Sequence, residues 1–417
     1  MKDLNALCRF LIQVVYTLAG ALVLPFIFFS PRLRQGWAQR LGLGLPRSCD
    51  IWIQGASAGE CALIPGLVQG LAKHSIVATT CTQQGLEVLA SINSTGSFFY
   101  RFFPFDLPVL MHWALGVMRP KVVLLLETEI WPGLLLACAD RKIPVLVING
   151  RMTTSSLAGY LWLQPLFALC PPACVAAIAP ADALRYGLVF PGALVEVTGN
   201  SKFDRALETA MLGHSENPLA ACVAPEYPFI VLGSVREEEE GTILQLLKAI
   251  KTLSPQSIIG LFPRHLHRVP AWKTLLEQAQ IPFVCRSSLM GPAAPGIVLL
   301  GDRFGELIAA YALASRAFVG GSLAVLGGQN FLEPLSQGIL TAVGVHVRNF
   351  SWVGDEIFKE LVFQSADVDA LARFLTQPAA QPGAVRSQVE NYIGSRQGAT
   401  ARALQIIDKY MEVGDHE

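Results

Sequence analysis

The chain has 417 residues, enough to bury two ordinary hydrophobic cores, so its length favours two domains or more. Lysine plus arginine and aspartate plus glutamate each number 32, and no repeat of aromatic and basic residues suggests stacking on bases. Nucleic acid is therefore not expected as a partner. The nine cysteines are scattered and set mostly in apolar runs, a pattern of buried reduced thiols. Cys170 and Cys174 lack a second pair at zinc-ligand spacing, so packing is the simpler interpretation.

An apolar run opens the chain. Residues 10–29 are nearly all apolar and have about the length of one bilayer crossing. The run lacks the short core and small-residue exit of a cleaved signal peptide, and Arg32, Arg34 and Arg40 follow it. We therefore expect residues 1–31 to form an uncleaved single-pass membrane anchor, with the bulk of the protein in the cytoplasm. A buried core helix of the first domain is the alternative that this pattern leaves open.

Short apolar strands alternate with helical patterns through the first half of the chain. Strands are predicted at 51–54, 75–80, 122–126, 144–148 and 195–197, and helices at 60–73, 85–92 and 132–141. Such alternation is typical of a parallel sheet covered by helices.

The second half restarts the alternation after a proline-rich stretch at 206–228, which we interpret as the hinge region. Strands are predicted at 229–232, 257–262, 282–285, 297–300, 317–319 and 340–343, and helices from 235, 270, 305 and 330. The predicted fold class is α/β, with two Rossmann-like domains, 32–212 and 213–417, facing a cleft. A last helical run over 384–411 is expected to pack across the domains. Ligands of such sheets bind at the carboxyl ends of the strands.

Carboxylates follow two of the strands predicted in the first half. Glu60 closes the small-residue turn GASAGE (55–60) at the start of a helix, where the helix dipole favours its ionised form. Glu127 and Glu129 come directly after the strand VVLLL and cannot both face a core without a large desolvation cost. Lys202 of GNSKFD (199–204) could neutralise a leaving phosphate. First-turn acids and an exposed hinge lysine are the structural alternatives.

Two motifs of the second half carry arginines. In GSVRE (233–237), Ser234 and Glu237 have the spacing of a capping box, which leaves Arg236 available for an anion. PRHLHR (263–268) groups four donors after a strand, and the planar fork of arginine suits phosphate or carboxylate. A merely solvated loop is the alternative. The histidines of this motif have no Asp, Glu or Cys at ligand spacing, so no metal is expected.

Glycines mark two further turns. Gly305 would expose backbone amides, and Glu306 could accept hydroxyls of a ribose or be a first-turn acid. The segment VGGSLAVLGGQNFLEP (319–334) runs from an apolar strand through two glycine pairs into a predicted helix. Asn330 and Glu333 fit a capping box, but the glycine pairs exceed what capping requires. The amides near residues 320–321 are therefore predicted to bind a nucleotide phosphate.

These motifs together resemble one family, the Kdo transferases, which move 3-deoxy-D-manno-octulosonic acid (Kdo) from CMP-Kdo onto the lipid A precursor. The resemblance runs in family order from the anchor to about residue 350. It is carried by GASAGE (55–60), ETEIWP (127–132), NGRM (149–152), GNSKFD (199–204), GSVREEEE (233–240), PRHLHR (263–268), GDRFGEL (301–307) and VGGSLAVLGGQNFLEP (319–334). It implies a GT-B glycosyltransferase that needs no metal or other cofactor. It also implies action at the cytoplasmic face of the inner membrane, in lipopolysaccharide synthesis.

The resemblance also implies roles for particular residues. Glu60 resembles the family's general base, and Glu127 and Lys202 resemble residues assigned to transition-state stabilisation. Contacts to CMP are expected from Pro263, Arg264, Phe304, Gly305, Glu306, Asn330, Phe331, Leu332 and Glu333. The chain departs from the family pattern in the donor loop, at Gln329, at 266–267 and at 345–348. Members of the family transfer one, two or several sugars, so more than one transfer is possible.

Three other functions remain as alternatives. Another GT-B transferase would use a UDP- or GDP-sugar donor. An NAD-linked oxidoreductase is disfavoured, because no GxGxxG opens a strand–helix turn with an acidic residue about twenty positions later. A non-catalytic membrane scaffold would tolerate alanine at Glu60, Glu127 and Lys202.

Overall fold

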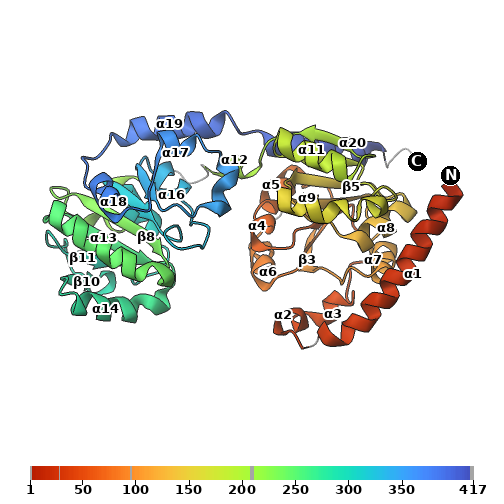
Figure 1. Cartoon of the computed structure of the whole chain (residues 1–417), viewed down its shortest axis with the longest axis horizontal. Coiled ribbons are helices and arrows are strands. Elements are labelled where there is room, and N and C mark those ends of the chain that lie inside the picture. Colours follow the sequence, from red (N-terminus) through yellow and green to blue (C-terminus); the bar gives the residue numbers. More distant parts are fainter. Residues whose placement is uncertain (1, 28, 94–95, 207–210, 414–417) are drawn as a thin grey trace. The chain divides into compact units, whose positions relative to one another are not determined.

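The computed structural model describes residues 2–27, 29–93, 96–206 and 211–413, and the chain forms two compact units. Unit 1 runs to Asp204 and takes up the chain again from Arg396, and unit 2 comprises Arg205–Ser395 (Figure 1). The chain therefore passes between the units twice. Of the hinge region proposed at 206–228, residues 207–210 lie outside the described residues.

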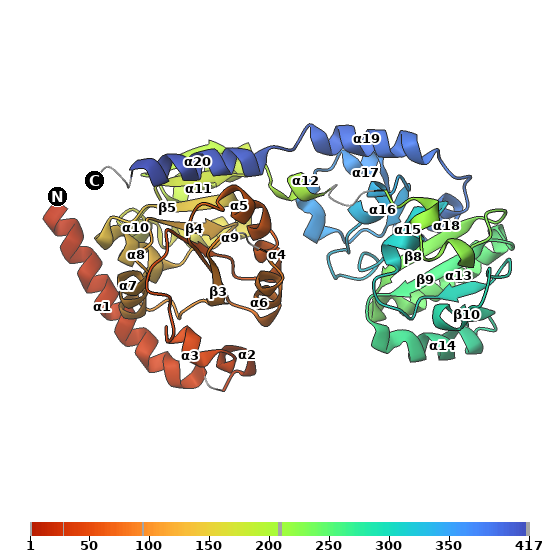
Figure 2. The same ribbon diagram turned by 180° about the vertical axis from the view of Figure 1, so that it is seen from behind.

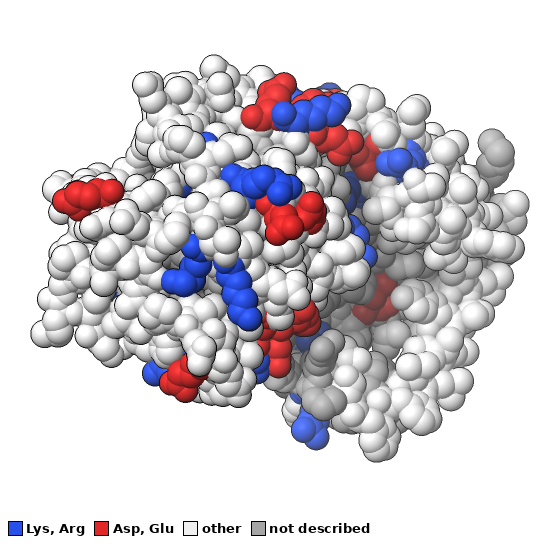
Figure 3. Space-filling view, turned by 60° about the vertical axis from the view of Figure 1, so that its left-hand side comes forward, with Lys and Arg blue, Asp and Glu red and all other residues white. Residues whose placement is uncertain are grey.

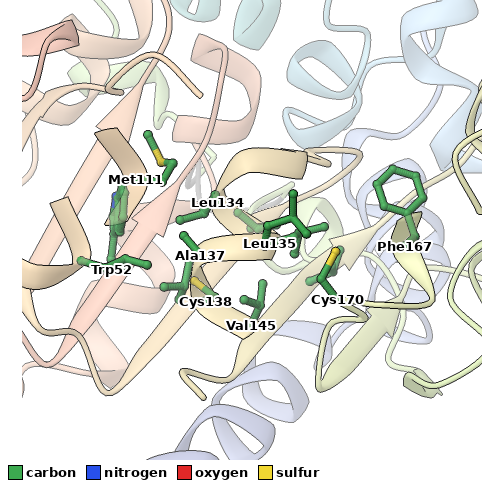
Figure 4. Packing of buried hydrophobic residues seen from close by; sticks show 14 of the residues in the cluster. Trp52, Met111, Leu134, Leu135, Ala137, Cys138, Val145, Phe167 and Cys170 are labelled. Atoms are coloured by element: carbon green, nitrogen blue, oxygen red, sulfur yellow. The ribbon is translucent and has the colours of Figure 1, made fainter. Parts of the chain in front are cut away.

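Unit 1 is built on a seven-stranded sheet in the order β3-β2-β1-β4-β5-β6-β7, with parallel pairing throughout. Side chains alternate along each strand, so Trp52 and Val123 enter one core cluster while Ile51 and Leu124 enter another. Figure 4 shows part of the first cluster. Because both faces of the central strands are buried, these strands appear in the sequence as continuous apolar runs. The strands are β1 (Ile51–Gln54), β2 (Ile76–Thr80), β3 (Phe98–Phe102), β4 (Val122–Leu126), β5 (Val145–Gly150), β6 (Cys174–Ala177) and β7 (Leu194–Val197).

Helices cover both faces of this sheet. Residues of α7 and α8 enter the cluster around Trp52, and residues of α5 and α20 enter the cluster around Ile51. The helices of unit 1 are α1 (Lys2–Ile27), α2 (Pro31–Arg34), α3 (Trp37–Arg40), α4 (Ala58–Cys61), α5 (Ile64–Gly70), α6 (Gln83–Ala90), α7 (Pro108–Met118), α8 (Pro132–Arg141), α9 (Thr154–Leu161), α10 (Gln164–Phe167), α11 (Pro180–Val189) and α20 (Ala399–Val413), with α12 (Lys202–Arg205) at the unit boundary.

The helix α1 is long and apolar enough to cross a membrane, by length and composition. In the structure it lies along α7 and α8, as both ribbon views show (Figures 1 and 2). On the face of the molecule shown in Figure 3, acidic and basic side chains are interspersed and most atoms belong to uncharged residues.

Unit 2 contains a second seven-stranded parallel sheet, in the order β10-β11-β9-β8-β12-β13-β14. Its strands are β8 (Phe229–Val235), β9 (Ile258–Pro263), β10 (Phe283–Cys285), β11 (Val298–Leu300), β12 (Arg316–Val319), β13 (Thr341–Val343) and β14 (Val362–Gln364). Its α-helices are α13 (Glu240–Leu253), α14 (Val269–Gln278), α15 (Leu307–Leu313), α16 (Leu332–Ser336), α17 (Ile357–Glu360), α18 (Val368–Leu375) and α19 (Pro382–Gly394). Short 3-10 turns are η1 (His214–Glu216), η2 (Ala220–Cys222), η3 (Glu237–Glu239), η4 (Leu266–Arg268), η5 (Arg286–Ser288) and η6 (Arg348–Val353).

The predicted class, two parallel α/β sheets, is confirmed, and the differences are local. Strands β3, β6 and β14 were not predicted. The edge strand β3 carries the partly exposed FFY before its buried end, and β6 and β14 have only four and three residues. The single helix predicted at 60–73 is two helices, because α5 restarts with Pro65 in its first turn.

The last helical run was predicted as one helix, and this is wrong. It breaks between α19 and α20 at Gly398, whose φ of 92° few residues other than glycine adopt. The Asp204 carboxylate then accepts hydrogen bonds from the N–H groups of Gly398 and Thr400, each at 2.6 Å, at the start of α20. The helix α19 belongs to unit 2 and α20 to unit 1.

Candidate active site

Glu60 lies in the turn after β1, at the carboxyl end of the unit 1 sheet. Its Oε2 accepts a hydrogen bond from the Ser57 backbone N–H at 2.6 Å and another from the Ser57 hydroxyl, a capping box for the four-residue helix α4. The capping alternative drawn from the sequence therefore applies to Glu60. It does not exclude chemistry, because the cap fixes the direction of a half-buried carboxylate.

Glu127 directly follows β4 and pairs with Lys202. The Glu127 Oε1 atom lies 2.5 Å from the Lys202 Nζ, and the side chains are 13% and 25% exposed. The Asn149 amide, from β5, donates to the same oxygen at 3.5 Å. The backbone of Glu127 has a φ of 56°, and the Tyr186 hydroxyl donates to its carbonyl at 2.7 Å. Glu127 and Lys202, which the resemblance assigns to the same task, are therefore in contact. Glu127 does not lie in the first turn of a helix, and Lys202 is not an exposed lysine.

Glu129 completes this carboxylate cluster, although the predicted site residues did not include it. Burial, and secondly the Glu60 carboxylate, raise the pKa of Glu129 to about 7. The Trp131 indole N–H donates to its Oε2 at 2.7 Å, and the Gln54 amide also hydrogen-bonds its carboxylate. The motif ETEIWP indicated two carboxylates, but the sequence does not show that Glu129 is the one whose pKa is raised.

A buried chain of hydrogen bonds fixes the orientation of the Gln54 amide. The Trp52 indole N–H donates to the Thr79 hydroxyl at 2.8 Å, and this hydroxyl donates to the Gln54 Oε1 at 2.6 Å. All three residues are fully buried. Because its oxygen is engaged with Thr79, Gln54 presents its NH₂ group to Glu129.

In unit 2, a cavity of about 260 Å³ collects residues from three motifs at the carboxyl end of the sheet. It lies beside β8, β9 and α15 and is lined by Ser234, Phe262, Pro263, Arg264, Leu266, Gly301, Arg303, Phe304, Gly305, Leu307, Ile308 and Glu333. Pro263, Arg264, Phe304, Gly305 and Glu333 are five of the nine residues expected to contact the nucleotide. Burial raises the pKa of Glu333, while its neighbours Asn330 and Arg264 act in the opposite direction.

The other four residues expected at the nucleotide do not line this cavity. Glu306 forms an ion pair with Arg286, at 3.3 Å, with both side chains mostly buried. Phe331 and Leu332 are buried, and Phe331 packs against Phe350 and Phe358. Asn330 is exposed and donates to the Glu333 carboxylate at 3.0 Å.

The glycine-rich segment does not present its amides in the way the sequence predicted. The N–H groups of Gly321, Ser322 and Leu323 donate to the Glu239 carboxylate at 2.5, 2.9 and 2.7 Å, and that of Gly320 donates to a carbonyl of β8. Glu239 is 1% exposed. The predicted phosphate-binding role of these amides is therefore wrong, because a carboxylate of the protein already occupies them.

Two capping interpretations also need correction. The strand β8 extends to Val235 and includes Ser234 with a φ of 54°, and η3 begins only at Glu237. Glu239, rather than Glu237, accepts the hydrogen bond from the Arg236 N–H, at 3.2 Å. The helix α16 begins at Leu332 with Phe331 as its N-cap residue, so Asn330 lies one position before the cap.

The two arginines of the basic loop PRHLHR have different surroundings. Arg268 forms a bidentate pair with Glu240, at 2.9 and 2.7 Å, and a second ion pair with Glu237 at 3.0 Å. The rings of His265 and His267 stack on each other with centroids 5.5 Å apart. Arg264 is the arginine of this loop that lines the cavity.

Sequence comparison identifies relatives across nearly the whole chain. Residues 35–205 match the family described as 3-Deoxy-D-manno-octulosonic-acid transferase (kdotransferase). The chain is 30% identical to the 3-deoxy-D-manno-octulosonic acid transferase of Haemophilus influenzae, over 97% of this chain and 99% of that protein. It is also 30% identical to the Bordetella pertussis enzyme of the same name, over 88% of both chains.

Structure comparison supports the fold. The UDP-GlcNAc 2-epimerase of Neisseria meningitidis, solved with UDP-GlcNAc, matches 87% of this chain and 99% of its own, with a TM-score of 0.54 and 14% identity. This similarity shows the fold alone, a GT-B fold of two parallel α/β domains. Together with the sequence relationship over the full length, it shows that the chain belongs to the 3-deoxy-D-manno-octulosonic acid (Kdo) transferase family, the glycosyltransferases that transfer Kdo in lipopolysaccharide synthesis.

Proposed function

We propose that the protein transfers Kdo from CMP-Kdo to a lipid A precursor, lipid IVA, with release of CMP and inversion at the anomeric carbon. The observation that carries the proposal is the cluster of Glu60, Glu127, Glu129 and Lys202 at the carboxyl end of the unit 1 sheet, in a chain of this family. Strand ends of parallel sheets are where ligands of such folds bind.

In this mechanism Glu60 removes the proton from an acceptor sugar hydroxyl. The freed oxygen attacks the anomeric carbon of Kdo while the bond from that carbon to the phosphate oxygen breaks, and CMP leaves with the electron pair. The Ser57 N–H and hydroxyl hold the Glu60 carboxylate in one orientation. The pair of Glu127 and Lys202 supplies fixed charges near the reacting groups, which stabilises an oxocarbenium-like transition state.

The donor nucleotide is assigned to the cavity of unit 2. Arg264 and Arg303 line this cavity and offer charged donors to the phosphate, and Glu333 offers a carboxylate to sugar hydroxyls. Gly305, with a φ of 86°, turns the chain at its wall without a side chain. Phe304, which is 89% exposed, is placed to cover a bound base or ribose.

The proposed location is the cytoplasmic face of the inner membrane, where both the acceptor lipid and CMP-Kdo are accessible. An apolar helix at the N-terminus supports a membrane attachment through residues 1–31. The number of Kdo residues added is proposed to be one or more, and mass spectrometry of the products from a tetraacylated lipid A precursor measures it.

The Glu60→Gln variant tests the mechanism. Removing a positioned base typically lowers the rate by about two to four powers of ten. We expect that loss in kcat, with CMP affinity unchanged because the cavity of unit 2 is untouched. The matched control is Glu87→Gln, which removes an exposed carboxylate of α6. Turnover of Glu60→Gln at the wild-type rate would refute the assignment.

The donor is tested separately by thermal unfolding. CMP is expected to raise the melting temperature more than UDP or GDP at equal concentration, since a ligand that binds only the folded state stabilises it. Stronger protection by UDP or GDP would favour the alternative, a GT-B transferase with another nucleotide-sugar donor.

A further inference from the structure

The helix α1 has two opposite faces, and the polar one points into the protein. Arg9 forms an ion pair with Asp140 at 2.7 Å, Gln13 donates to the same carboxylate at 2.7 Å, and the Tyr16 hydroxyl donates to Asp106 at 3.1 Å. Four residues on, a methyl group at Gly20 would come within 2.1 Å of the Leu107 side chain. The spacing 9, 13, 16, 20 is that of one helix face, so α1 is held to unit 1 over three turns.

The opposite face of α1 is apolar and exposed. It carries a large apolar residue at each step of three or four positions, and these side chains are 54% to 75% exposed: Leu4, Leu7, Leu11, Val15, Leu18, Leu22 and Phe26. A surface helix of a soluble protein shows the reverse pattern, with its apolar stripe toward the core. An apolar stripe of this length facing away from the protein marks an interaction surface.

The exposed apolar surface continues beyond α1. Val109 and Trp113 of α7 are 56% and 43% exposed. An apolar recess of about 280 Å³ lies between α1 and α7, and Phe10, Val14 and Val109 are among its lining residues. Exposed apolar residues at Phe10 and Val14 make the surface wider than the narrow seam of a coiled coil, whose flanking positions are usually charged.

The charges around this surface favour a lipid partner over a second copy of the chain. Residues 1–49 hold six basic residues and one acidic residue, whereas the remaining 368 hold 26 basic and 31 acidic residues. Arg9 is paired with Asp140 and Arg40 is buried, so Arg34 and Arg47 are the basic residues of this segment that the structure describes as exposed. A basic region beside an apolar surface complements anionic lipid headgroups. No charged residue occurs at 10–29, the part that would contact acyl chains.

We propose that α1 lies in the plane of the bilayer surface as a monotopic anchor, with its outer face in the acyl region and its inner face on unit 1, and does not cross the membrane. A crossing helix would carry Gln13 and Tyr16 into the hydrocarbon core, which is about 30 Å thick. Asp140 would then lose its hydrogen bond from Gln13, and Asp106 would lose its hydrogen bond from Tyr16. Asp106 is a buried carboxylate, and burial raises its pKa to about 7. The proposal rests on the membrane location put forward above and replaces the single-pass topology expected from the sequence.

Crosslinking in native membranes tests the topology. Gln13 and His112 bond each other through the ends of long side chains at 2.9 Å, so the double variant Gln13→Cys/His112→Cys, in a Cys8→Ser background, should be joined by a short bismaleimide while the protein stays membrane-bound. The control pair Leu22→Cys/His112→Cys joins the outer face to the same position and should not crosslink. A membrane-bound protein in which positions 13 and 112 are never joined by the bismaleimide would overturn the proposal.

A second measurement, the side of the membrane on which the N-terminus lies, tests the topology if the double-cysteine variant fails to fold. The single variant Asn5→Cys, in the same Cys8→Ser background, should react with a membrane-impermeant maleimide in inverted vesicles and remain unlabelled in spheroplasts. A crossing helix gives the opposite result and overturns the proposal. Turnover of CMP-Kdo by the same preparations tests the proposed reaction independently of the topology.

Vesicle flotation tests the occupant of the surface. Leu11→Asp places a charge on the outer face of α1, whereas Leu253→Asp places one on a residue of α13 with nearly equal exposure, 52% against 54%. We expect Leu11→Asp to lower partitioning to vesicles of phosphatidylglycerol and phosphatidylethanolamine by about tenfold, and Leu253→Asp to leave it unchanged. Equal partitioning of both variants, or a dimer that Leu11→Asp dissociates without an effect on partitioning, would contradict a lipid-facing role.

Discussion

Glutamates lie at the carboxyl ends of both sheets, but different groups donate hydrogen bonds to their carboxylates. In unit 2 the buried carboxylate of Glu239 accepts hydrogen bonds from four backbone N–H groups. In unit 1 the carboxylates of Glu60, Glu127 and Glu129 lie near one another and are served mainly by side-chain donors. Burial, and secondly the neighbouring Glu60 carboxylate, raise the pKa of Glu129 to about 7.

The comparison shows that burial alone does not decide what a glutamate does. A carboxylate that accepts hydrogen bonds from several aligned amides orders the chain around it. A partly buried carboxylate beside another carboxylate, as Glu129 is beside Glu60, has a raised pKa, which suits general acid or base chemistry. The first kind is structural and the second is a candidate for catalysis.

The largest effect is expected where the structural carboxylate is removed. Glu239→Ala leaves the amides of Gly321, Ser322 and Leu323 without their acceptor in a buried place, which should cost roughly 3–4 kcal/mol of unfolding free energy. The neighbouring Glu238→Ala, whose side chain is 47% exposed, should cost less than about 0.5 kcal/mol. Urea unfolding measures both. Equal losses for the two variants would show that the amides do not depend on Glu239.

The ion pair of unit 1 should give the next largest effect. Lys202→Met leaves Glu127 without its ammonium partner at 2.5 Å, and we expect a loss of roughly 2–3 kcal/mol. Adding Glu127→Gln should recover part of this loss in a double-mutant cycle. The surface pair of Lys73 and Asp408 is the control: its side chains are 69% and 44% exposed, so Lys73→Met should change stability by less than about 1 kcal/mol. A Lys202→Met protein as stable as the wild type would contradict the pairing.

Features that depend on residues close together in the sequence could be predicted, whereas contacts between segments far apart in the sequence could not. The turns after β1 and β4 were predictable because a buried strand followed by small or acidic residues has a local meaning. The role of Glu239 was not predictable, since its amide partners lie 82 to 84 residues further along the chain. The inner face of α1 did leave a signal, because the polar and small residues that interrupt the apolar run include Gln13, Tyr16 and Gly20.

The proton of Glu129 should appear as a pH dependence of stability. An unfolded glutamate titrates near pH 4.3, about 2.7 pH units below the folded value of about 7. The folded protein therefore holds more protons between these values, and the free energy of unfolding falls as the pH rises through this window. Glu129→Gln removes the titrating group, so the decrease between pH 5 and pH 8 should shrink by roughly 2–3 kcal/mol. Glu87→Gln, at an exposed position, should leave the pH profile unchanged. Parallel profiles for Glu129→Gln and the wild type would exclude the raised pKa.

The smallest effect is expected at Tyr311 of unit 2, a buried polar group that, unlike Glu239, has no hydrogen-bond partner among the described residues. Its hydroxyl is fully buried, and burial raises its pKa well above the usual value. A missing partner normally costs stability, so Tyr311→Phe removes an unsatisfied group and should change the free energy of unfolding by less than about 1 kcal/mol, in the stabilising direction.

The space around that hydroxyl gives a matched test. A methyl group at Gly233 would come within 2.0 Å of the Tyr311 hydroxyl and 2.7 Å of the ring carbon that bears it. Gly233→Ala should therefore be strongly destabilising alone and less so in the Tyr311→Phe background, because the closest of these contacts disappears. If Tyr311→Phe is instead destabilising by about 1 kcal/mol or more, the hydroxyl has a partner in solution, such as an ordered water, and unit 2 satisfies this group as fully as it does Glu239.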